Sequence, residues 1–225
     1  MTVKIKINTK ANVIPKDYRR LVLHFIKTAL EKEDIELYQK YYAEGNTLKK
    51  PFTFWVSLPK CTFKDKDIVL EKNELTFYIS TNETKLAFVL YNAFKKITLL
   101  TIGKENQSTK IYVSLVKDKE IKEEEIIINM LSPLVIRNHT KGQKDKYYIY
   151  GEDGFLDLFN IIVGDFVEIT AVKYKKVIVQ AYGTNIPSSL GVFKLKGDIK
   201  TLEKLYLTGL GSKTSAGFGK FNIIG

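Results

Sequence analysis

The chain has 225 residues, of which 44% are hydrophobic, and it carries a formal net charge of +11 at pH 7. This length and hydrophobic content suffice for one large domain or two small ones. No run of about eighteen apolar residues occurs, so we expect no membrane span. The first residues, MTVKIKINTK, alternate charged and apolar side chains and lack the apolar core of a signal peptide. We therefore expect a cytoplasmic protein.

The counts of a few residue types limit the cofactors and the partner. Cys61 is the only cysteine, which excludes an internal disulfide and a cysteine-based zinc site. Only His24 and His139 offer imidazoles, so we expect no metal and no cofactor. Lysine and arginine outnumber aspartate and glutamate by 36 to 25, which favours a polyanionic partner: nucleic acid first, an anionic membrane second. Part of this excess is compositional, because nearly all the basic residues are lysines.

The first half of the chain predicts the order strand, helix, strand, strand, helix, strand. Alternation over residues 3–9 is typical of a strand, and Pro15 and Asp17 suit the start of a helix over 17–30. A second short helix is expected at 34–42. The later elements are strands at 50–58 and 75–81, an amphipathic helix at 84–96, and strands at 97–103 and 110–116. This order is that of a ferredoxin-like domain.

After a charged linker at 117–125 the same order repeats in compressed form. The expected elements are a strand at 126–138 interrupted by Pro133, a short helix at 153–162, a hairpin at 166–184, a helix at 198–207 and a last strand at 220–225. We therefore predict an α+β protein of two tandem ferredoxin-like (RRM-like, βαββαβ) domains, residues 1–120 and 121–225. The duplication is inferred from the order alone, because no close sequence repeat accompanies it.

Near the C-terminus, residues 209–219 read GLGSKTSAGFG. The stretch is not a P-loop, because the spacing to a Lys-Ser/Thr pair is wrong, and it follows a helix and precedes a strand, which also excludes a dinucleotide fingerprint. Backbone amides made accessible by glycine, together with Lys213 and three hydroxyls, suit a sugar-phosphate backbone. A purely structural turn is the alternative.

Four stretches resemble one known family. GLGSKTSAGFGKFNI resembles the glycine-rich signature of the RAMP superfamily, and specifically of the CRISPR repeat-processing endoribonucleases. KKPFTFWVSL (49–58) resembles their Lys-x-Phe-Thr segment, INMLSPLVIRN (128–138) their Ser-Pro strand, and GVFKLKGDIKTLEKLYLTGLG (191–211) their last hairpin, helix and loop. The resemblance covers nearly the whole chain and implies tandem ferredoxin-like domains that bind a repeat RNA and cut it once.

The resemblance also implies a metal-independent reaction in which a ribose 2′-OH attacks the adjacent phosphate. The products are a 2′,3′-cyclic phosphate and a 5′-OH. A base, an acid and a cation are needed. In the family these roles are associated with a tyrosine on the first helix, a histidine near the end of the helical region, and the lysine of the Lys-x-Phe-Thr segment.

The match to these catalytic positions is incomplete. Lys50 corresponds best to the lysine, with Lys49 beside it, but the stretch LYQKYYAEGNT (37–47) holds tyrosines and no histidine. The first helix instead carries His24, and imidazole is the side chain best suited to acid–base work near neutral pH. The catalytic candidates are therefore His24, Lys50, Tyr38 and Tyr42. Each has a plainer interpretation: a helix-surface histidine, a solvated lysine, and two tyrosines that pack together four residues apart.

Other residues are candidates for contacts with RNA. Arginines at the start of the first helix suit phosphate, because a guanidinium offers a fork of donors, and the polar loop RNHTKGQKDK adds an arginine and a histidine. The full set is Arg19, Arg20, Lys49, Arg137, His139, Gly209, Gly211, Ser212, Lys213, Thr214, Ser215, Gly217 and Gly219.

The sequence thus favours an endoribonuclease that matures CRISPR RNA. A non-cleaving repeat-RNA-binding protein of the same fold is the second interpretation, and a RAMP subunit of an interference complex is the third. The expected partner is CRISPR repeat RNA, with proteins of an interference complex as further candidates and no membrane. The sequence leaves open whether the protein is a monomer or a homodimer.

Overall fold

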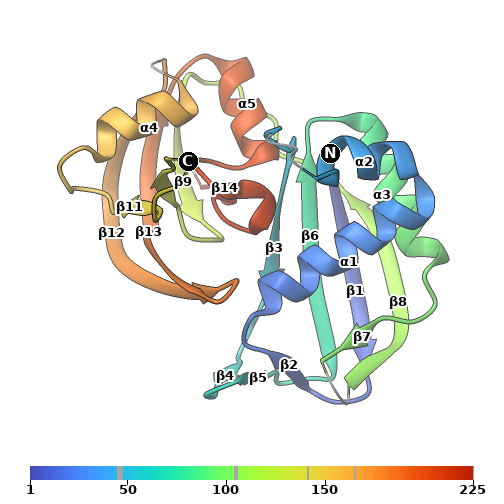
Figure 1. The fold of residues 1–225 in the computed structure, drawn as a ribbon. Coiled ribbons are helices and arrows are strands. Elements are labelled where there is room, and N and C mark those ends of the chain that lie inside the picture. The colour runs from blue at the N-terminus through green and yellow to red at the C-terminus, as the bar shows by residue number, and fades with distance from the viewer. Residues whose placement is uncertain (45–47, 104–105, 141, 165, 225) are drawn as a thin grey trace. The chain divides into compact units, whose positions relative to one another are not determined.

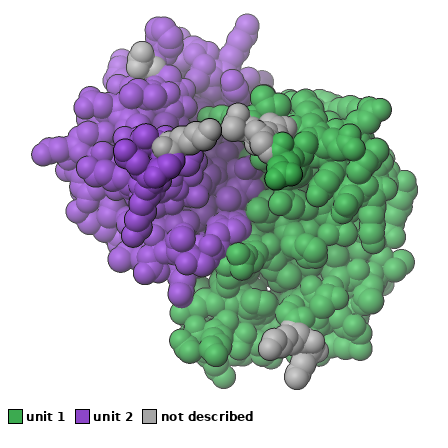
Figure 2. Space-filling model, viewed as in Figure 1, with its two compact units in different colours: residues 1–118 green, residues 119–225 purple. Residues whose placement is uncertain are grey.

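The computed structural model describes residues 1–44, 48–103, 106–140, 142–164 and 166–224. The chain divides into two compact units, residues 1–118 and 119–225 (Figure 1, Figure 2). Each unit has its own hydrophobic core. No helix in the described part of the chain is long and apolar enough to cross a membrane.

The first unit is an antiparallel sheet with two helices across one face (Figure 1). Its main strands are β1 (Thr2–Thr9), β3 (Phe52–Ser57), β6 (Glu74–Thr81) and β8 (Asn106–Val116), and its helices are α1 (Tyr18–Glu33) and α3 (Thr84–Lys96). The strand order is β3-β6-β1-β8, with the two-residue β7 (Thr101–Ile102) at the edge. Alternate side chains of the central strands, such as Val3 and Phe77, are buried with the apolar faces of the helices. This is the ferredoxin-like order.

Local interactions set where the helices of the first unit begin. The Asp17 carboxylate accepts a hydrogen bond from the Arg20 N–H at the start of α1. Asp34 accepts one from Leu37 N–H at 2.9 Å and so begins α2 (Ile35–Tyr42) directly after α1. The Tyr41 hydroxyl donates to Glu83 Oε2 at 2.6 Å, which ties α2 to the residue before α3.

A smaller sheet, not expected from the sequence, lies beside the main one in this unit. Its order is β2-β5-β4, from β2 (Val13–Pro15), β4 (Thr62–Phe63) and β5 (Asp67–Val69). These strands are too short for an alternating pattern to show in the sequence. Asn106 fixes the segment that leads into β2, because its side chain donates to the carbonyls of Ala11 and Val13.

The second unit repeats the same topology. Its main strands are β9 (Glu125–Met130), β12 (Glu168–Ala181), β13 (Thr184–Lys196) and β14 (Phe221–Ile223), and its helices are α4 (Phe155–Val163) and α5 (Ile199–Thr208). The order β12-β13-β9-β14 matches that of the first unit. A separate hairpin of β10 (Ile136–Asn138) and β11 (Lys146–Tyr148) follows β9. The expected α+β class with tandem ferredoxin-like folds is confirmed.

The predicted hairpin at 166–184 is wrong in its bounds. Residues 168–181 form one strand, and its partner β13 begins after the turn at Tyr182 and Gly183. Pro187 argues against a strand, yet at that point β13 pairs only with β12, because β9 joins it from Val192 onward. The proline has no N–H to donate, but among the described residues no second strand lies there to accept a hydrogen bond from it.

Two other strands are shorter in the structure than the sequence predicts. The strand expected at 97–103 is reduced to β7. The strand expected at 126–138 ends at Met130, and Leu134 and Val135 then form isolated bridges before β10. The last residue of the strand expected at 220–225 lies outside the described residues.

Candidate nucleic-acid interface

In the first unit, two lysines lie against one tyrosine ring. Lys27 Nζ on α1 is 4.8 Å from the centroid of the Tyr42 ring on α2, and Lys50 Nζ, just before β3, is 4.9 Å from it. Burial lowers the pKa of Lys50 below its ordinary value, and the nearby charge of Lys27 lowers it further. An anion placed beside the two ammonium groups would relieve this repulsion.

The other two catalytic candidates lie on the same two helices. Tyr38 packs against Tyr42 with ring centroids 5.6 Å apart and the ring planes tilted by 33°, as expected for residues four apart. His24 is exposed and precedes Lys27 by one helical turn on α1, so the two side chains leave the helix on neighbouring parts of its surface. Helix packing thus gathers Lys27, Tyr38, Tyr42 and Lys50, with His24 one turn along. Tyr41, by contrast, is buried and bonded to Glu83, which raises its pKa.

The basic residues at the start of α1 differ in accessibility. Arg19 is only 8% exposed and its guanidinium lies 4.8 Å from the Tyr18 ring centroid, so little of it is accessible to RNA. Arg20 is exposed and lies 4.0 Å from the Asp17 carboxylate. Lys49 is exposed beside the half-buried Lys50. Of the two arginines, Arg20 is the one placed to reach a phosphate.

In the second unit, the glycine-rich loop is an ordered structure with an unusual backbone. Gly209, Gly211, Gly217 and Gly219 all have positive φ, as does Lys213 at 55°. A Cβ on Gly219 would lie 2.0 Å from the Leu210 carbonyl oxygen, and one on Gly211 would lie 2.6 Å from the Val135 carbonyl oxygen. These glycines therefore shape the loop, and all four are buried.

Hydrogen bonds attach the two ends of this loop to the segment after β9. Ser212 N–H donates to the Val135 carbonyl, and Gly219 N–H donates to the Pro133 carbonyl. Between these anchors, the N–H groups of Lys213, Thr214 and Ser215 donate to no acceptor within the described part of the chain. The middle of the loop therefore presents consecutive amide donors beside the Lys213 ammonium, a combination suited to a phosphate oxygen.

Four side chains converge on the Asp145 carboxylate beside this loop. Arg137 Nη1 lies 3.0 Å from it, His139 Nδ1 2.7 Å, the Tyr147 hydroxyl 3.2 Å and Lys213 Nζ 3.9 Å. Partial burial alone would raise the pKa of Asp145, but the hydrogen bonds from His139 and Arg137 outweigh it and hold the pKa at about 2. Burial and the charge of Arg137 lower the pKa of Lys213, while Asp145 acts in the opposite direction. With Arg137 and Lys213 against one carboxylate, the cluster keeps net positive charge.

The structure therefore forms two groups of candidate residues, one around Tyr42 in the first unit and one around Asp145 in the second. Lys27, Asp145 and Tyr147 belong to these groups and were missed in the sequence. Lys27 could have been found from its place three residues after His24, and Asp145 is the only acid in the basic stretch RNHTKGQKDK. The buried Lys220, at the end of the loop, donates to the Tyr206 carbonyl and lies over the Tyr206 ring, so it has a structural role.

Comparison with known proteins agrees with the resemblance found in the sequence and with the fold. Residues 116–223 match the family described as CRISPR associated protein Cas6, C-terminal. No curated protein matches the chain in sequence. The second unit thus matches the Cas6 C-terminal family model, and the resemblance to RAMP-type CRISPR repeat-processing proteins is confirmed.

Solved structures resemble the whole chain in fold. The structure of a Cas6-related protein from Pyrococcus furiosus has a TM-score of 0.79 at 23% identity, and the match covers 100% of this chain and 99% of that one. A structure described as a RAMP protein binding different RNA substrates has 0.79 at 21%, and a Cas6 product complex has 0.70 at 16%, each covering both chains completely. At these identities the likeness shows the fold alone.

The close approach at Gly219 generates a stability prediction. Gly219→Ala should lower the free energy of unfolding by more than the about 1–3 kcal/mol that a strained backbone costs, because its Cβ would also meet the Leu210 carbonyl. Gly183→Ala is the control: its φ is similar, at 76°, but a Cβ there meets nothing within 4 Å. Urea unfolding of both variants measures the difference. Equal losses would show that the loop tolerates the added methyl group.

The Asp145 cluster generates a prediction on pH. Because the pKa of Asp145 is about 2 in the folded protein and near 4 when unfolded, its stabilising contribution is complete above about pH 4 and is lost as the pH falls toward 2. The stability difference between wild type and Asp145→Asn should therefore shrink over this range. Unfolding measured at several pH values tests this, with Asp153→Asn, at an exposed carboxylate, as the control. A difference independent of pH would contradict it.

Proposed function

We propose that this protein binds CRISPR repeat RNA and cleaves it once by metal-independent transesterification, leaving a 2′,3′-cyclic phosphate and a 5′-OH. The observation that carries the proposal is the pair of lysines held against Tyr42, with the exposed His24 one turn away. The Cas6 C-terminal match of the second unit and the descriptions of the structural neighbours as Cas6 proteins support the choice of substrate.

The reaction requires two proton transfers and stabilisation of charge. A base removes the proton of the 2′-OH, the O2′–P bond forms, the P–O5′ bond breaks, and an acid protonates the leaving 5′-oxygen. His24 is the residue of the group best suited to one of the proton transfers near neutral pH. Tyr38 and Tyr42 are poorer bases as a type, and Tyr42 also acts as the surface that positions both lysines.

The two lysines suit the developing negative charge on the phosphate. Burial is the main cause that lowers the pKa of Lys50, and repulsion from the Lys27 ammonium lowers it further. Charge that grows on the phosphoryl oxygens during the attack would be stabilised by both, and most strongly in the transition state. Lys27 is the nearby second cation.

The glycine-rich loop and the Asp145 cluster are proposed to hold the RNA backbone. Their contribution is the consecutive amides of residues 213–215, the Lys213 ammonium and the Arg137 guanidinium. Such contacts position RNA without reading its sequence. His139, bonded through Nδ1 to Asp145, would add a donor to the same surface.

A non-cleaving RNA-binding role is the second candidate. The observation in its favour is that the residues from 37 to 47, where the family carries a histidine, contain none. One structural neighbour is described only as binding different RNA substrates. Both roles predict binding of the repeat, and only the first predicts a cut.

Cleavage of the repeat in EDTA distinguishes the two roles. The wild type should yield a 2′,3′-cyclic phosphate, and a 2′-deoxy nucleotide 5′ of the cut should abolish cleavage but not binding. His24→Ala should lower the single-turnover rate by roughly 10²–10⁴-fold. Lys50→Ala should cost less than the roughly 10²–10³-fold typical of one lost oxyanion donor, because Lys27 remains.

Lys32→Ala is the control for these variants, because it removes an exposed charge from the last turn of α1. If His24→Ala cuts at the wild-type rate, the proton transfers belong to the tyrosines or to His139. Binding of the repeat without any cut by the wild type would establish the second role.

Binding by the loop is tested with Lys213→Glu. The change should weaken repeat binding and make the dependence of log Kd on log salt shallower by about one, because a phosphate contact and its released counterion are lost. Lys200→Glu on α5 makes the same charge change at an exposed site of the same unit. Equal effects of the two variants on Kd, measured by fluorescence anisotropy, would show that the loop is a structural turn and does not contact the RNA.

A further inference from the structure

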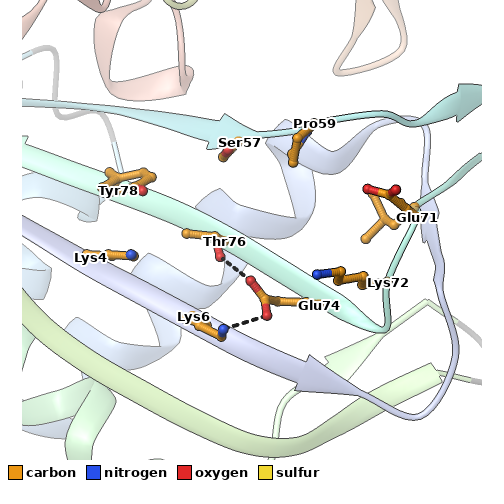
Figure 3. A pocket seen from close by; sticks show the side chains of 10 residues that line it. Lys4, Lys6, Ser57, Pro59, Glu71, Lys72, Glu74, Thr76 and Tyr78 are labelled. Carbon is orange, nitrogen blue, oxygen red and sulfur yellow. Dashed lines mark hydrogen bonds and ion pairs between the residues drawn. The ribbon is translucent and has the colours of Figure 1, made fainter.

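Strand β6 presents its side chains alternately to the two sides of the first sheet. Thr76 and Tyr78 line a hollow of about 360 Å³ on the face away from the helices (Figure 3). Phe77, which lies between them in the sequence, is buried in the core beneath α1 and α3. Thr81, the last residue of β6, is in phase with Phe77 and is only 1% exposed. Its hydroxyl therefore lies on the helical side of the sheet.

The Thr81 hydroxyl holds the segment that carries Lys50. Its Oγ1 donates to the Pro51 carbonyl at 2.7 Å, directly before β3 begins at Phe52. Proline has a fixed φ and no N–H, so this carbonyl is the one backbone group of Pro51 that can form a hydrogen bond. The residue before a proline is restricted to extended backbone. Fixing Pro51 therefore also fixes the direction in which the Lys50 side chain leaves the chain.

Glu83 holds the helix that carries Tyr42. The buried Tyr41 donates its hydroxyl proton to Glu83 Oε2 at 2.6 Å. Burial raises the pKa of Tyr41 and the bond to the carboxylate raises it further, so the hydroxyl keeps its proton and remains the donor. Helix α2 has only eight residues, and helices shorter than about 12–15 residues depend on tertiary contacts. Because Tyr42 directly follows Tyr41, the bond to Glu83 places its ring as well.

The two contacts are joined to each other. Glu83 N–H donates to Thr81 Oγ1 at 3.0 Å, so the hydroxyl both accepts and donates a hydrogen bond. Glu83 is the N-cap residue of α3, but within the described residues of that helix its carboxylate caps no N–H group. The carboxylate is directed at α2 instead, where Lys40 Nζ lies 3.7 Å from Oε1. One short connection between β6 and α3 thus contacts both segments that meet at the Tyr42 ring.

We propose that Thr81 and Glu83 are positioning residues for cleavage, which hold Lys50 and the Tyr42 ring so that Lys50 and Lys27 face the reacting phosphate together. This role rests on the proposed function. Thr81 is buried and acts only through Pro51, so it needs no contact with RNA. A displacement of about 1 Å at a catalytic group can cost roughly 10²-fold in rate. Loss of either contact should therefore slow the chemical step more than it weakens RNA binding.

The kinetic test replaces the Thr81 hydroxyl by a methyl group. Thr81→Val should lower the single-turnover rate of repeat cleavage at saturating protein by about 10-fold to 100-fold and leave the Kd for the repeat nearly unchanged. Thr81→Ser restores the hydroxyl and should restore most of the rate. The matched control is Thr9→Val at the other end of the same sheet, where a buried threonine hydroxyl donates to the Ala11 carbonyl, also at 2.7 Å. Equal rate losses in Thr81→Val and Thr9→Val, or no rescue by serine, would contradict the proposal.

A spectroscopic test needs no cleavage. The lysines of the full-length protein are reductively methylated with ¹³C-formaldehyde, and the signals of Lys27 and Lys50 are identified with Lys27→Arg and Lys50→Arg. Because both ammonium groups lie against the Tyr42 ring, the ring current should shift their methyl signals upfield in the wild type. Thr81→Val should reduce the upfield shift of Lys50. Tyr41→Phe, which breaks the contact between α2 and Glu83, should reduce the shifts of both lysines.

The two measurements separate this proposal from the proposed function. Thr9→Val should leave both lysine signals unchanged. Wild-type signals together with wild-type rates in both Thr81→Val and Tyr41→Phe would overturn the positioning role. If the wild type binds the repeat without cutting it, the proposed function fails, and the lysine signals alone then decide whether Thr81 and Glu83 position the two lysines.

Discussion

The main sheet of each unit has one face that must be buried, and the positions of the candidate residues on the helices of the first unit follow from that constraint. In β1 the period of two sends Val3, Ile5 and Ile7 under the helices and leaves Lys4 and Lys6 outside. The helices that cover the apolar face carry His24 and Lys27 on their outer surface. One alternating strand thus separates a helical surface with acid–base groups from a sheet surface with rings and lysines.

Packing of α2 on α1 then creates a group of like charges. The fold places Lys27 and Lys50 on one tyrosine ring, and the ring face attracts each ammonium while the two repel each other. Desolvation and repulsion both lower the pKa of Lys50. Such an arrangement stabilises the folded chain less than a carboxylate in the same place would, which fits the proposed role of the two lysines in holding a phosphate.

The sequence allowed the fold to be predicted wherever one element carried its own pattern. The alternation at 3–9, the helix at 84–96 and the glycine-rich loop each specify a local conformation. The bounds of β13 could not be predicted, because Pro187 is tolerated only through the partial pairing of that strand. The spacing of three residues from His24 indicates Lys27 as a neighbour on the same helix, but its contact with Tyr42 depends on how two helices pack and could not be predicted.

If the Asp145 cluster holds the RNA backbone as proposed, its side chains are ordered before the ligand arrives. Arg137 lies in the first strand of a short hairpin, His139 in the loop that joins its two strands, and Lys213 in the glycine-rich loop. The carboxylate holds all three within reach of one point. Ordering long side chains at the moment of binding would cost conformational entropy, and here Asp145 has already restricted them. Because two permanent cations surround one carboxylate, the cluster still attracts a phosphate. The internal anion therefore sets the geometry, and the remaining positive charge favours the polyanion.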